Sequence, residues 1–159
     1  METVDGVVTT GPPVRLPKEK TGKFYHGTHA DIFTNIRNEG LRCACEPGMG
    51  ATKDYCDIWD AFGIVCLTDD PKKARFYSVV TTKMSMKLPE TDMLVVEVDP
   101  EYLMDAHLKR RLSSKGGDWC VSREFDYRQR IPPEALTFYK WDEKIRDFVR
   151  LDLPPRRDW

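Results

Sequence analysis

Hydrophobic and polar residues are arranged along this chain in short segments whose periodicity predicts a mixture of helices and strands. Residues 30–39 carry apolar side chains at helical spacing, and Gly40 stands where a helix is expected to end. The two aromatic residues at 24–25, just before this helix, predict the end of a short strand. Residues 28–29 are then expected to form the turn between the strand and the helix.

A second strand and helix are predicted in the middle of the chain. Residues 63–68 form a short run rich in apolar and β-branched residues, which is typical of a buried strand. Asp70 is a favoured N-cap and Pro71 a favoured first helical residue, so a helix is expected from Pro71 to about Val80. Residues 82–91 are assigned to a loop.

The second half of the chain is dominated by strand patterns. Residues 93–98 are the clearest strand, and the Asp-Pro pair that follows ends it. Residues 119–127 alternate between apolar and polar side chains, which places Glu124 on the polar face. Residues 136–141 and 145–151 predict a hairpin. The remaining segments are assigned to a long loop at 42–62, one or two helical turns at 101–107 and a basic loop at 109–118.

The order of these elements favours an α+β fold over a doubly wound parallel sheet. Helices are expected early in the chain and strands late, which is typical of a mixed or antiparallel sheet. A length of 159 residues fits one domain, which we place at residues 21–153. Residues 1–20 are interpreted as a flexible N-terminal arm with a short strand at residues 7–8, and residues 154–159 as a C-terminal tail.

Composition narrows the classes of function. The chain carries 25 basic and 26 acidic residues, and a net charge of −1 provides no overall attraction to nucleic acid or to an anionic membrane. Five cysteines without a CxxC pair, and three histidines, indicate neither a zinc site nor a disulfide framework, so we expect no metal and a reducing, cytoplasmic location. The sequence contains no run of about 18 apolar residues and no leader pattern, so no membrane attachment is expected. The chain is expected to act as a monomer.

Four motifs occur in an order that resembles one enzyme family. They are FYHGT with a helix ending in NEGL, then GIVCLTDDPKKARFY, then VVEVDPEYL, and last REF followed by RIPPEAL. Together they cover residues 23–140 and are similar to the ADP-ribosyltransferases of the diphtheria-toxin-like class, which include the poly(ADP-ribose) polymerases and small bacterial or phage enzymes. The resemblance implies a split pair of β-sheets with flanking helices, and NAD, the co-substrate, bound between the sheets.

The resemblance assigns roles to four residues of the first two motifs. His26 would hydrogen-bond a ribose hydroxyl of NAD, and Gly27 would offer its backbone N–H and C=O groups to the nicotinamide carboxamide. Thr28 would line the same pocket. Tyr77 would stack its ring on nicotinamide, a contact that contributes about 1 kcal/mol.

Glu124 is the candidate catalytic residue of the last motif. By resemblance, its carboxylate would hold the ribose 2′-hydroxyl and stabilise the positive charge that develops as the bond to nicotinamide breaks. Glu97 and Glu134 are competing carboxylates, but Glu97 falls in a strand that is expected to be buried and Glu134 falls in a turn. We therefore prefer Glu124.

Two positions depart from the family pattern. Relatives of the His-Tyr-Glu type often carry a tyrosine in the strand at 63–68, where this chain has none, so Cys66 is taken as its replacement and Thr68 as a second polar group. Ser122 stands two residues before Glu124, where arginine-modifying relatives usually carry an acid or an amide. This serine disfavours an arginine-directed activity.

The sequence thus predicts an NAD-dependent ADP-ribosyltransferase that modifies a protein, DNA or RNA acceptor and releases nicotinamide, in the setting of a toxin, of antiviral defence or of an effector. Two alternatives stay open. RNA 2′-phosphotransferases share the fold and an HGT motif, and Arg37, Arg42 and Arg123 would be the residues that grip the RNA phosphate here. A catalytically degenerate module that binds NAD or another nucleotide would explain the missing strand tyrosine.

Overall fold

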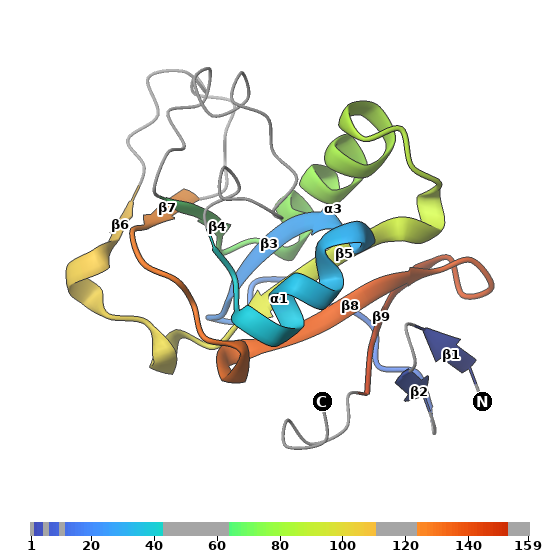
Figure 1. Ribbon diagram of the computed structural model, residues 1–159, viewed down its shortest axis with the longest axis horizontal. Helices are drawn as coiled ribbons and strands as arrows, with labels where there is room; N and C mark the ends of the chain where they lie inside the picture. The colour runs from blue at the N-terminus through green and yellow to red at the C-terminus, as the bar shows by residue number, and fades with distance from the viewer. Residues whose placement is uncertain (1, 5–6, 10–11, 43–63, 111–123, 153–159) are drawn as a thin grey trace.

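A seven-stranded antiparallel sheet forms the centre of the protein (Figure 1). The computed structural model describes residues 2–4, 7–9, 12–42, 64–110 and 124–152. Within these residues the strands of the sheet are β3 (Phe24–His29), β4 (Val65–Thr68), β5 (Met93–Val98), β6 (Leu108–Arg110), β7 (Glu124–Tyr127), β8 (Leu136–Asp142) and β9 (Asp147–Arg150). They pair in the order β6-β7-β4-β3-β5-β8-β9. The predicted α+β class is confirmed, and of the mixed or antiparallel sheet that the sequence predicts, the structure has the antiparallel one.

Two α-helices of the described residues cover the sheet. α1 (Phe33–Glu39) follows a 3-10 turn at Ala30–Ile32 and ends at Gly40, whose φ of +88° is readily accessible to glycine. α3 (Pro71–Val79) begins after Asp70, whose side chain accepts a hydrogen bond from the first helical turn. Both helices lie where the sequence predicts them.

β3 is longer than the sequence predicts. A turn is expected at residues 28–29, yet every residue of β3 pairs with β5. Pairing with this apolar, well-formed neighbour keeps the His-Gly-Thr segment extended, because its backbone groups find partners in the ladder. The turn from strand to helix begins only at Ala30, so the predicted turn at 28–29 is wrong.

Two predicted loops contain regular structure. α3 continues as a π-helical segment over Val80–Ser85, and a 3-10 turn follows at Glu90–Asp92, so the loop predicted at residues 82–91 is wrong in part. Leu108–Arg110 forms the strand β6 where a basic loop is predicted to begin. These segments are rich in polar residues and show no clear periodicity. Their structure depends on a preceding helix or on a neighbouring strand.

Other predicted elements are present. β5 matches the predicted central strand, and β8 and β9 form the predicted hairpin. The helical turns expected at residues 101–107 are two 3-10 turns, Pro100–Tyr102 and Asp105–His107. The long loop predicted at 42–62 lies, after its first residue, outside the described residues, as do most of the basic loop and residues 119–123 of the strand that carries Glu124.

The N-terminal residues form two further pairings. β1 (Glu2–Val4) and β2 (Val7–Thr9) pair with each other, so the strand predicted at residues 7–8 is present in a hairpin of its own. Residues 14–16, which the sequence places in the N-terminal arm, pair beside β9 through an antiparallel bridge and backbone hydrogen bonds.

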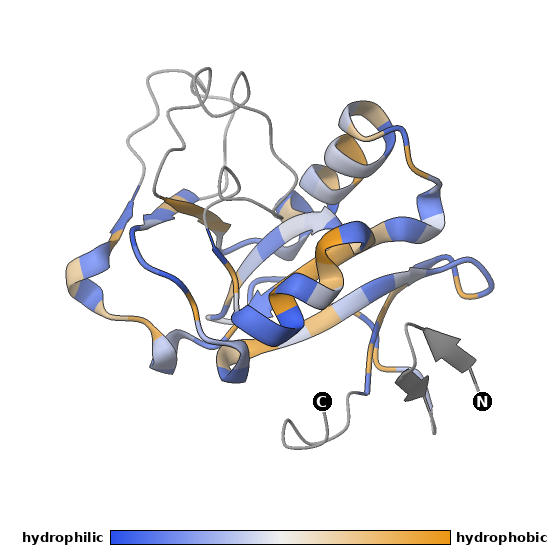
Figure 2. Ribbon diagram, in the orientation of Figure 1, coloured by the Kyte–Doolittle hydropathy of each residue, from blue (hydrophilic) through white to orange (hydrophobic). Residues whose placement is uncertain are grey.

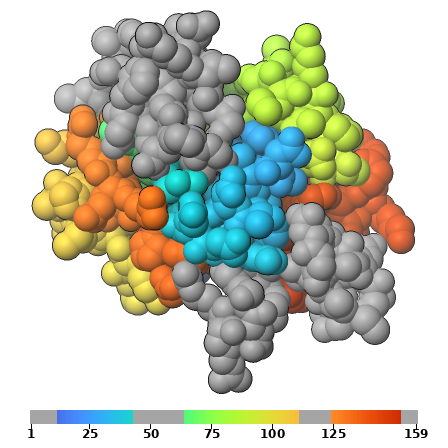
Figure 3. All heavy atoms as spheres, viewed as in Figure 1, coloured from blue at the N-terminus to red at the C-terminus, as the bar shows by residue number. Residues whose placement is uncertain are grey.

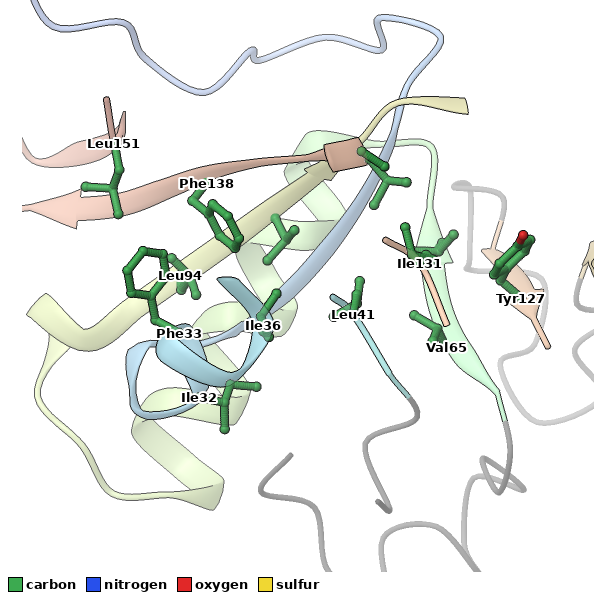
Figure 4. Packing of buried hydrophobic residues seen from close by; sticks show 14 residues of the cluster. Ile32, Phe33, Ile36, Leu41, Val65, Leu94, Tyr127, Ile131, Phe138 and Leu151 are labelled. Carbon is green, nitrogen blue, oxygen red and sulfur yellow. The ribbon is translucent and has the colours of Figure 1, made fainter. Parts of the chain in front are cut away.

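The core under α1 is hydrophobic and buried. Figure 4 shows Phe33 and Ile36 of α1 close to Phe138 of β8 and Leu94 of β5. The rings of Phe33 and Phe138 meet edge to face with their centroids 5.0 Å apart. α1 carries both hydrophobic and hydrophilic residues (Figure 2), as expected of a helix with one face on a sheet. In the space-filling view this segment covers the centre of its face of the molecule (Figure 3).

The opposite face of the sheet lies under α3. Tyr25 of β3 and Val95 of β5 are fully buried there, next to Ala74 of α3. Because successive residues of a strand point to opposite faces, β3 and β5 contribute alternate side chains to the two cores. This alternation decides which residues of β3, β4 and β7 lie toward α3.

Candidate functional site

The candidate site lies at the junction of β3 and β4. Among the described residues these two strands pair only at Tyr25 and Thr68. Beyond that pair, Nδ1 of His26 lies 2.7 Å from the carbonyl oxygen of Cys66. A carbonyl oxygen can only accept a hydrogen bond, so Nδ1 carries the proton and donates it. The imidazole of His26 therefore links the two strands where their ladder stops.

His26 is poised as a neutral hydrogen-bond acceptor. Burial lowers the pKa of His26, and the hydrogen bond to Cys66, a smaller effect, opposes that shift. The ring is therefore neutral at physiological pH. With Nδ1 protonated, Nε2 holds a lone pair, which suits it to accept a hydrogen bond from a ligand hydroxyl.

Glu124 lies in the same row of the sheet as the junction. It pairs with Thr68 of β4, and Thr68 pairs with Tyr25 of β3. Two strand spacings separate the Cα atoms of Glu124 and Tyr25, a distance of about 10 Å. Because Tyr25 directly precedes His26, the backbones of Glu124 and His26 lie in neighbouring parts of the sheet, but the strand alternation directs the His26 side chain to the face opposite that of Tyr25 and Glu124.

The polar side of β7 faces α3. Glu124 shares the face of Thr68 and Tyr25, whereas Phe125 and Tyr127 point into or pack against the core under α1. The hydroxyl of Tyr77 in α3 donates a hydrogen bond to Oε1 of Glu124. The helix thus provides a direct partner for the carboxylate.

Burial and charge act against each other at Glu124. Burial raises the pKa of the Glu124 carboxyl, the positive charge of Lys73 opposes this shift, and the negative charge of Asp126 adds to it. Lys73 also lies over the Tyr77 ring, with Nζ 5.6 Å from the ring centroid. Lys73 and Tyr77 are one helical turn apart, and both act on the same carboxylate.

Gly27 brings α3 close to β3. A Cβ atom at this position would lie 2.1 Å from the carbonyl oxygen of Ala74 and 2.7 Å from the backbone nitrogen of Ser78. Substitution would therefore force the helix away from the strand. The helix backbone explains the glycine whether or not a ligand approaches it, and this close approach sets the position of Tyr77 above the sheet.

Thr28 and Ser78 stabilise the contact between β3 and α3 through hydrogen bonds. Thr28 is buried, and its carbonyl oxygen accepts hydrogen bonds from Oγ of Ser78 at 2.7 Å and from Oγ1 of Thr82 at 3.3 Å. Oγ of Ser78 also accepts from the backbone N–H of Leu94 in β5 at 2.9 Å. Ser78 thus joins α3 to two strands, and the described contacts of Thr28 are structural ones.

The other predicted site residues differ in their environment. Cys66 is half-buried and supplies its carbonyl oxygen to His26. Thr68 is fully buried, and its Oγ1 accepts a hydrogen bond from the backbone N–H of Asp70 at 3.2 Å, which supports the start of α3. Ser122 lies outside the described residues.

The competing carboxylates have other environments. Glu97 is 6% exposed, forms an ion pair with Lys23 at 3.2 Å and accepts a hydrogen bond from the Tyr139 hydroxyl at 3.3 Å. Glu134 is exposed in a 3-10 turn after β7. Glu97 lies in the same row of the sheet as Glu124, because Glu97 pairs with Tyr25. The two carboxylates differ in their partners, since Glu97 is engaged by Lys23 and Tyr139, whereas Glu124 is hydrogen-bonded by Tyr77 of α3.

Sequence reasoning missed two residues of this region, Lys73 and Ser78. The spacing of Lys73, four residues before Tyr77, is a signal that could have found it, because residues four apart share one face of a helix. Ser78 gives no such signal, since a serine within a helix usually has no tertiary role.

Comparisons of this chain with protein-family models, with curated proteins and with solved structures found no match. Within the described ranges, no three His, Cys, Asp or Glu side chains come together as metal ligands. No helix in the same ranges is long and apolar enough to cross a membrane.

Proposed function

We propose that this protein is an NAD-dependent ADP-ribosyltransferase that modifies a macromolecular acceptor and releases nicotinamide. The observation that carries the proposal is the Glu124 carboxylate, which is half-buried, hydrogen-bonded by Tyr77 and located two strands from the strand of His26. Shielded carboxylates that face a sugar are the groups that glycoside-cleaving enzymes use.

The residues present fit the ribose of NAD. Ribose offers hydroxyl groups, and the neutral His26 presents Nε2 as an acceptor for one of them. The carboxylate of Glu124 accepts a hydrogen bond from another hydroxyl. Its negative charge also stabilises the positive charge that develops on the ribose carbon, and shielding from water strengthens that effect.

The overall reaction balances without another reactant. The bond between the nicotinamide nitrogen and the ribose carbon breaks, and nicotinamide leaves with the electron pair. A nucleophilic oxygen or nitrogen of the acceptor forms a new bond to the same carbon and loses a proton to solvent. The chain's part is to hold the ribose, to stabilise the developing charge and to orient Glu124 through Tyr77.

The junction of β3 and β4 supports the split-sheet architecture that the resemblance implies. β3 pairs with β5 along its full length, whereas its described pairing with β4 is limited to Tyr25 and Thr68. The sheet is therefore most easily opened between β3 and β4. His26 lies at this junction, where a ligand bound between two half-sheets would meet it.

The RNA 2′-phosphotransferase alternative receives less support. Arg42 forms an ion pair with Glu39 at 3.0 Å, and the guanidinium of Arg37 lies over the Phe33 ring, 5.7 Å from its centroid. Both arginines are thus engaged around α1. Arg123, the third residue of that alternative, lies outside the described residues.

The substitution Glu124→Gln tests the proposal. It preserves shape and removes the charge, so release of nicotinamide from NAD should fall by about a hundredfold or more while the thermal melting temperature stays near that of the wild type. Glu134→Gln is the matched control, because it neutralises an exposed carboxylate away from β7 and should leave activity unchanged. Full activity in a folded Glu124→Gln protein would overturn the assignment.

Calorimetric titration with NAD separates an enzyme from a degenerate binding module. The proposal expects wild-type protein to bind NAD and to turn it over, and Glu124→Gln protein to bind it without turnover. Binding without turnover by the wild type would instead favour the degenerate module.

A further inference from the structure

We infer that Arg75 is a positioning residue, which ties an N-terminal strap, residues 14–20, to α3 and thereby holds Tyr77 against Glu124. The inference rests on the proposed function for its catalytic consequence. The claim that the strap fixes α3 does not depend on that function, because it is based on contacts outside the candidate site.

Arg75 joins three segments of the chain. Its Nη1 donates a hydrogen bond to the carbonyl oxygen of Pro17 at 2.8 Å, and its Nη2 donates to the carbonyl oxygen of Leu16 at 2.7 Å. Nη2 also lies 3.4 Å from Oδ1 of Asp147 in β9. The Arg75 side chain is 20% exposed, so these charge-assisted bonds are largely shielded from water. A lysine cannot reproduce them, because its three N–H donors sit on one nitrogen and lack the planar fork that reaches two carbonyl oxygens and a carboxylate.

The strap is itself fixed to the sheet. The backbone N–H of Leu16 donates to the Phe148 carbonyl at 3.0 Å, and the N–H of Arg150 donates to the Val14 carbonyl at 2.8 Å. The side chain of Leu16 is 1% exposed and packs in the core under α3 that also contains Tyr25. Residues 14–16 therefore form a firm anchor for the guanidinium.

The outer contacts of the strap contribute less. Lys72 and Glu19 form an ion pair at 3.5 Å, with side chains 63% and 84% exposed. Pairs this exposed add little to stability. Lys20 of the strap also pairs with Asp69 at 3.6 Å, but Asp69 precedes α3. Arg75 is therefore the less exposed of the two links to the helix itself, and the Lys72–Glu19 pair serves as an internal control.

Arg75 and Tyr77 act on opposite sides of one helix. Residues two positions apart in a helix point about 200° apart, and the two side chains indeed reach different ends of the sheet. Arg75 reaches β9 and the strap, whereas Tyr77 reaches Glu124 in β7. With Gly27 beneath it, α3 is held at both sides and from below. Loss of the Arg75 contacts would allow α3 to shift and would weaken the hydrogen bond between Tyr77 and Glu124.

The test compares Arg75→Ala, Arg75→Lys and the control Lys72→Ala. Arg75→Ala should lower the rate of nicotinamide release by about tenfold or more, because small displacements of catalytic groups are costly. The acid limb of its pH profile should also move to higher pH, since the Glu124 anion loses a hydrogen bond. Lys73 and Asp126, the charged groups that act on Glu124, are unchanged in these proteins. Lys72→Ala should match the wild type in rate and profile.

A double-mutant cycle distinguishes positioning from general destabilisation. In a Tyr77→Phe background, which lacks the hydroxyl, Arg75→Ala should cause little further loss of rate. If the two substitutions lower the rate independently, so that their fold-losses multiply in the double variant, the inference is wrong. A wild-type rate and pH profile in folded Arg75→Ala protein would also overturn it.

Hydrogen exchange of the α3 amides gives a readout that does not depend on activity. Arg75→Lys, which keeps the charge if Arg75→Ala fails to fold, should lower protection of residues 75–79, and Lys72→Ala should not. If the wild type releases no nicotinamide, the proposed function fails, yet a selective loss of protection still supports the strap's hold on α3. Unchanged protection in Arg75→Lys protein refutes it.

Discussion

At the scale of single residues, the account depends on how Glu124 keeps its charge. Burial alone would favour the protonated form of the Glu124 carboxyl. This neutral form is a weaker hydrogen-bond acceptor and cannot stabilise a cation. Lys73 and the Tyr77 hydroxyl both favour the ionised form. α3 therefore supplies the carboxylate with one charge and one hydrogen bond from positions one helical turn apart.

Removal of Lys73 should shift the pH dependence of the reaction. Since Lys73 lowers a pKa that burial has raised, Lys73→Met should raise the pKa of Glu124 further. The active form is the ionised one, so activity is lost as the pH falls through this pKa. The acid limb of the nicotinamide-release profile should therefore move to higher pH, because the opposite charge that favours the Glu124 anion is gone.

Lys72→Met is the matched control for this shift. It removes an exposed lysine of the same helix whose ion-pair partner is Glu19, and its profile should coincide with that of the wild type. Burial lowers the pKa of His26 and raises that of Glu124, so both groups contribute to the acid limb, but His26 is unchanged in both variants and a difference between them reports on Glu124. An acid limb that stays in place or moves to lower pH in Lys73→Met protein contradicts the role given to Lys73.

The sequence identified most of these residues but not their contacts. Tyr77 and Glu124 are predicted site residues, and the resemblance gives Tyr77 a stacking role that stays a prediction. The hydrogen bond between them depends on the rotation and height of α3 above the sheet, which are set by tertiary packing. No periodicity along the chain contains that information.

At the scale of elements, Gly27 decides how closely α3 approaches β3. The carbonyl oxygen of Ala74 and the backbone nitrogen of Ser78 occupy the space that any side chain would need. Because both are helix backbone atoms, the helix must move as a unit if that space is filled. The position of Tyr77 is therefore coupled to the absence of a side chain in the strand.

Gly27→Ala should destabilise the protein by about 3 kcal/mol, the upper end for an overpacked site, measured by urea unfolding. Gly22→Ala is the control. No atom lies within 4 Å of its added Cβ, and its φ of +86° costs about 1 kcal/mol of backbone strain. Equal stability of the two variants would show that α3 does not rest on Gly27 as described.

Elements with strong local signals were predicted well. β5 is a run of apolar residues, the β8–β9 hairpin has a polar turn between strand patterns, and α3 has an Asp-Pro start. The full length of β3 and the π-helical segment Val80–Ser85 were not predicted. The first depends on pairing with β5, and the second depends on the helix α3 that precedes it. A strand with a His-Gly-Thr centre stays extended by pairing with β5, and the π-helical segment extends a helix that is already formed.

At the scale of the whole molecule, long-range strand order creates the site. β7 comes late in the chain, yet it pairs with β4 and lies two strands from β3. The sequence predicts the α+β class and a mixed or antiparallel sheet, but it does not predict that order, because register between distant strands depends on the complete core. The strap at residues 14–20 is likewise fixed by the Arg75 side chain and by backbone groups of β9, which are far away in the sequence.

The central claim is transfer of ADP-ribose to a macromolecule, and one measurement tests it most directly. The full chain is incubated with NAD labelled in its adenylate phosphate and with separate protein, DNA and RNA pools. The account predicts stable label in at least one pool, an equal amount of free nicotinamide, and neither product with Glu124→Gln protein. Absence of both label and nicotinamide release with the folded wild type, in every pool, would contradict it.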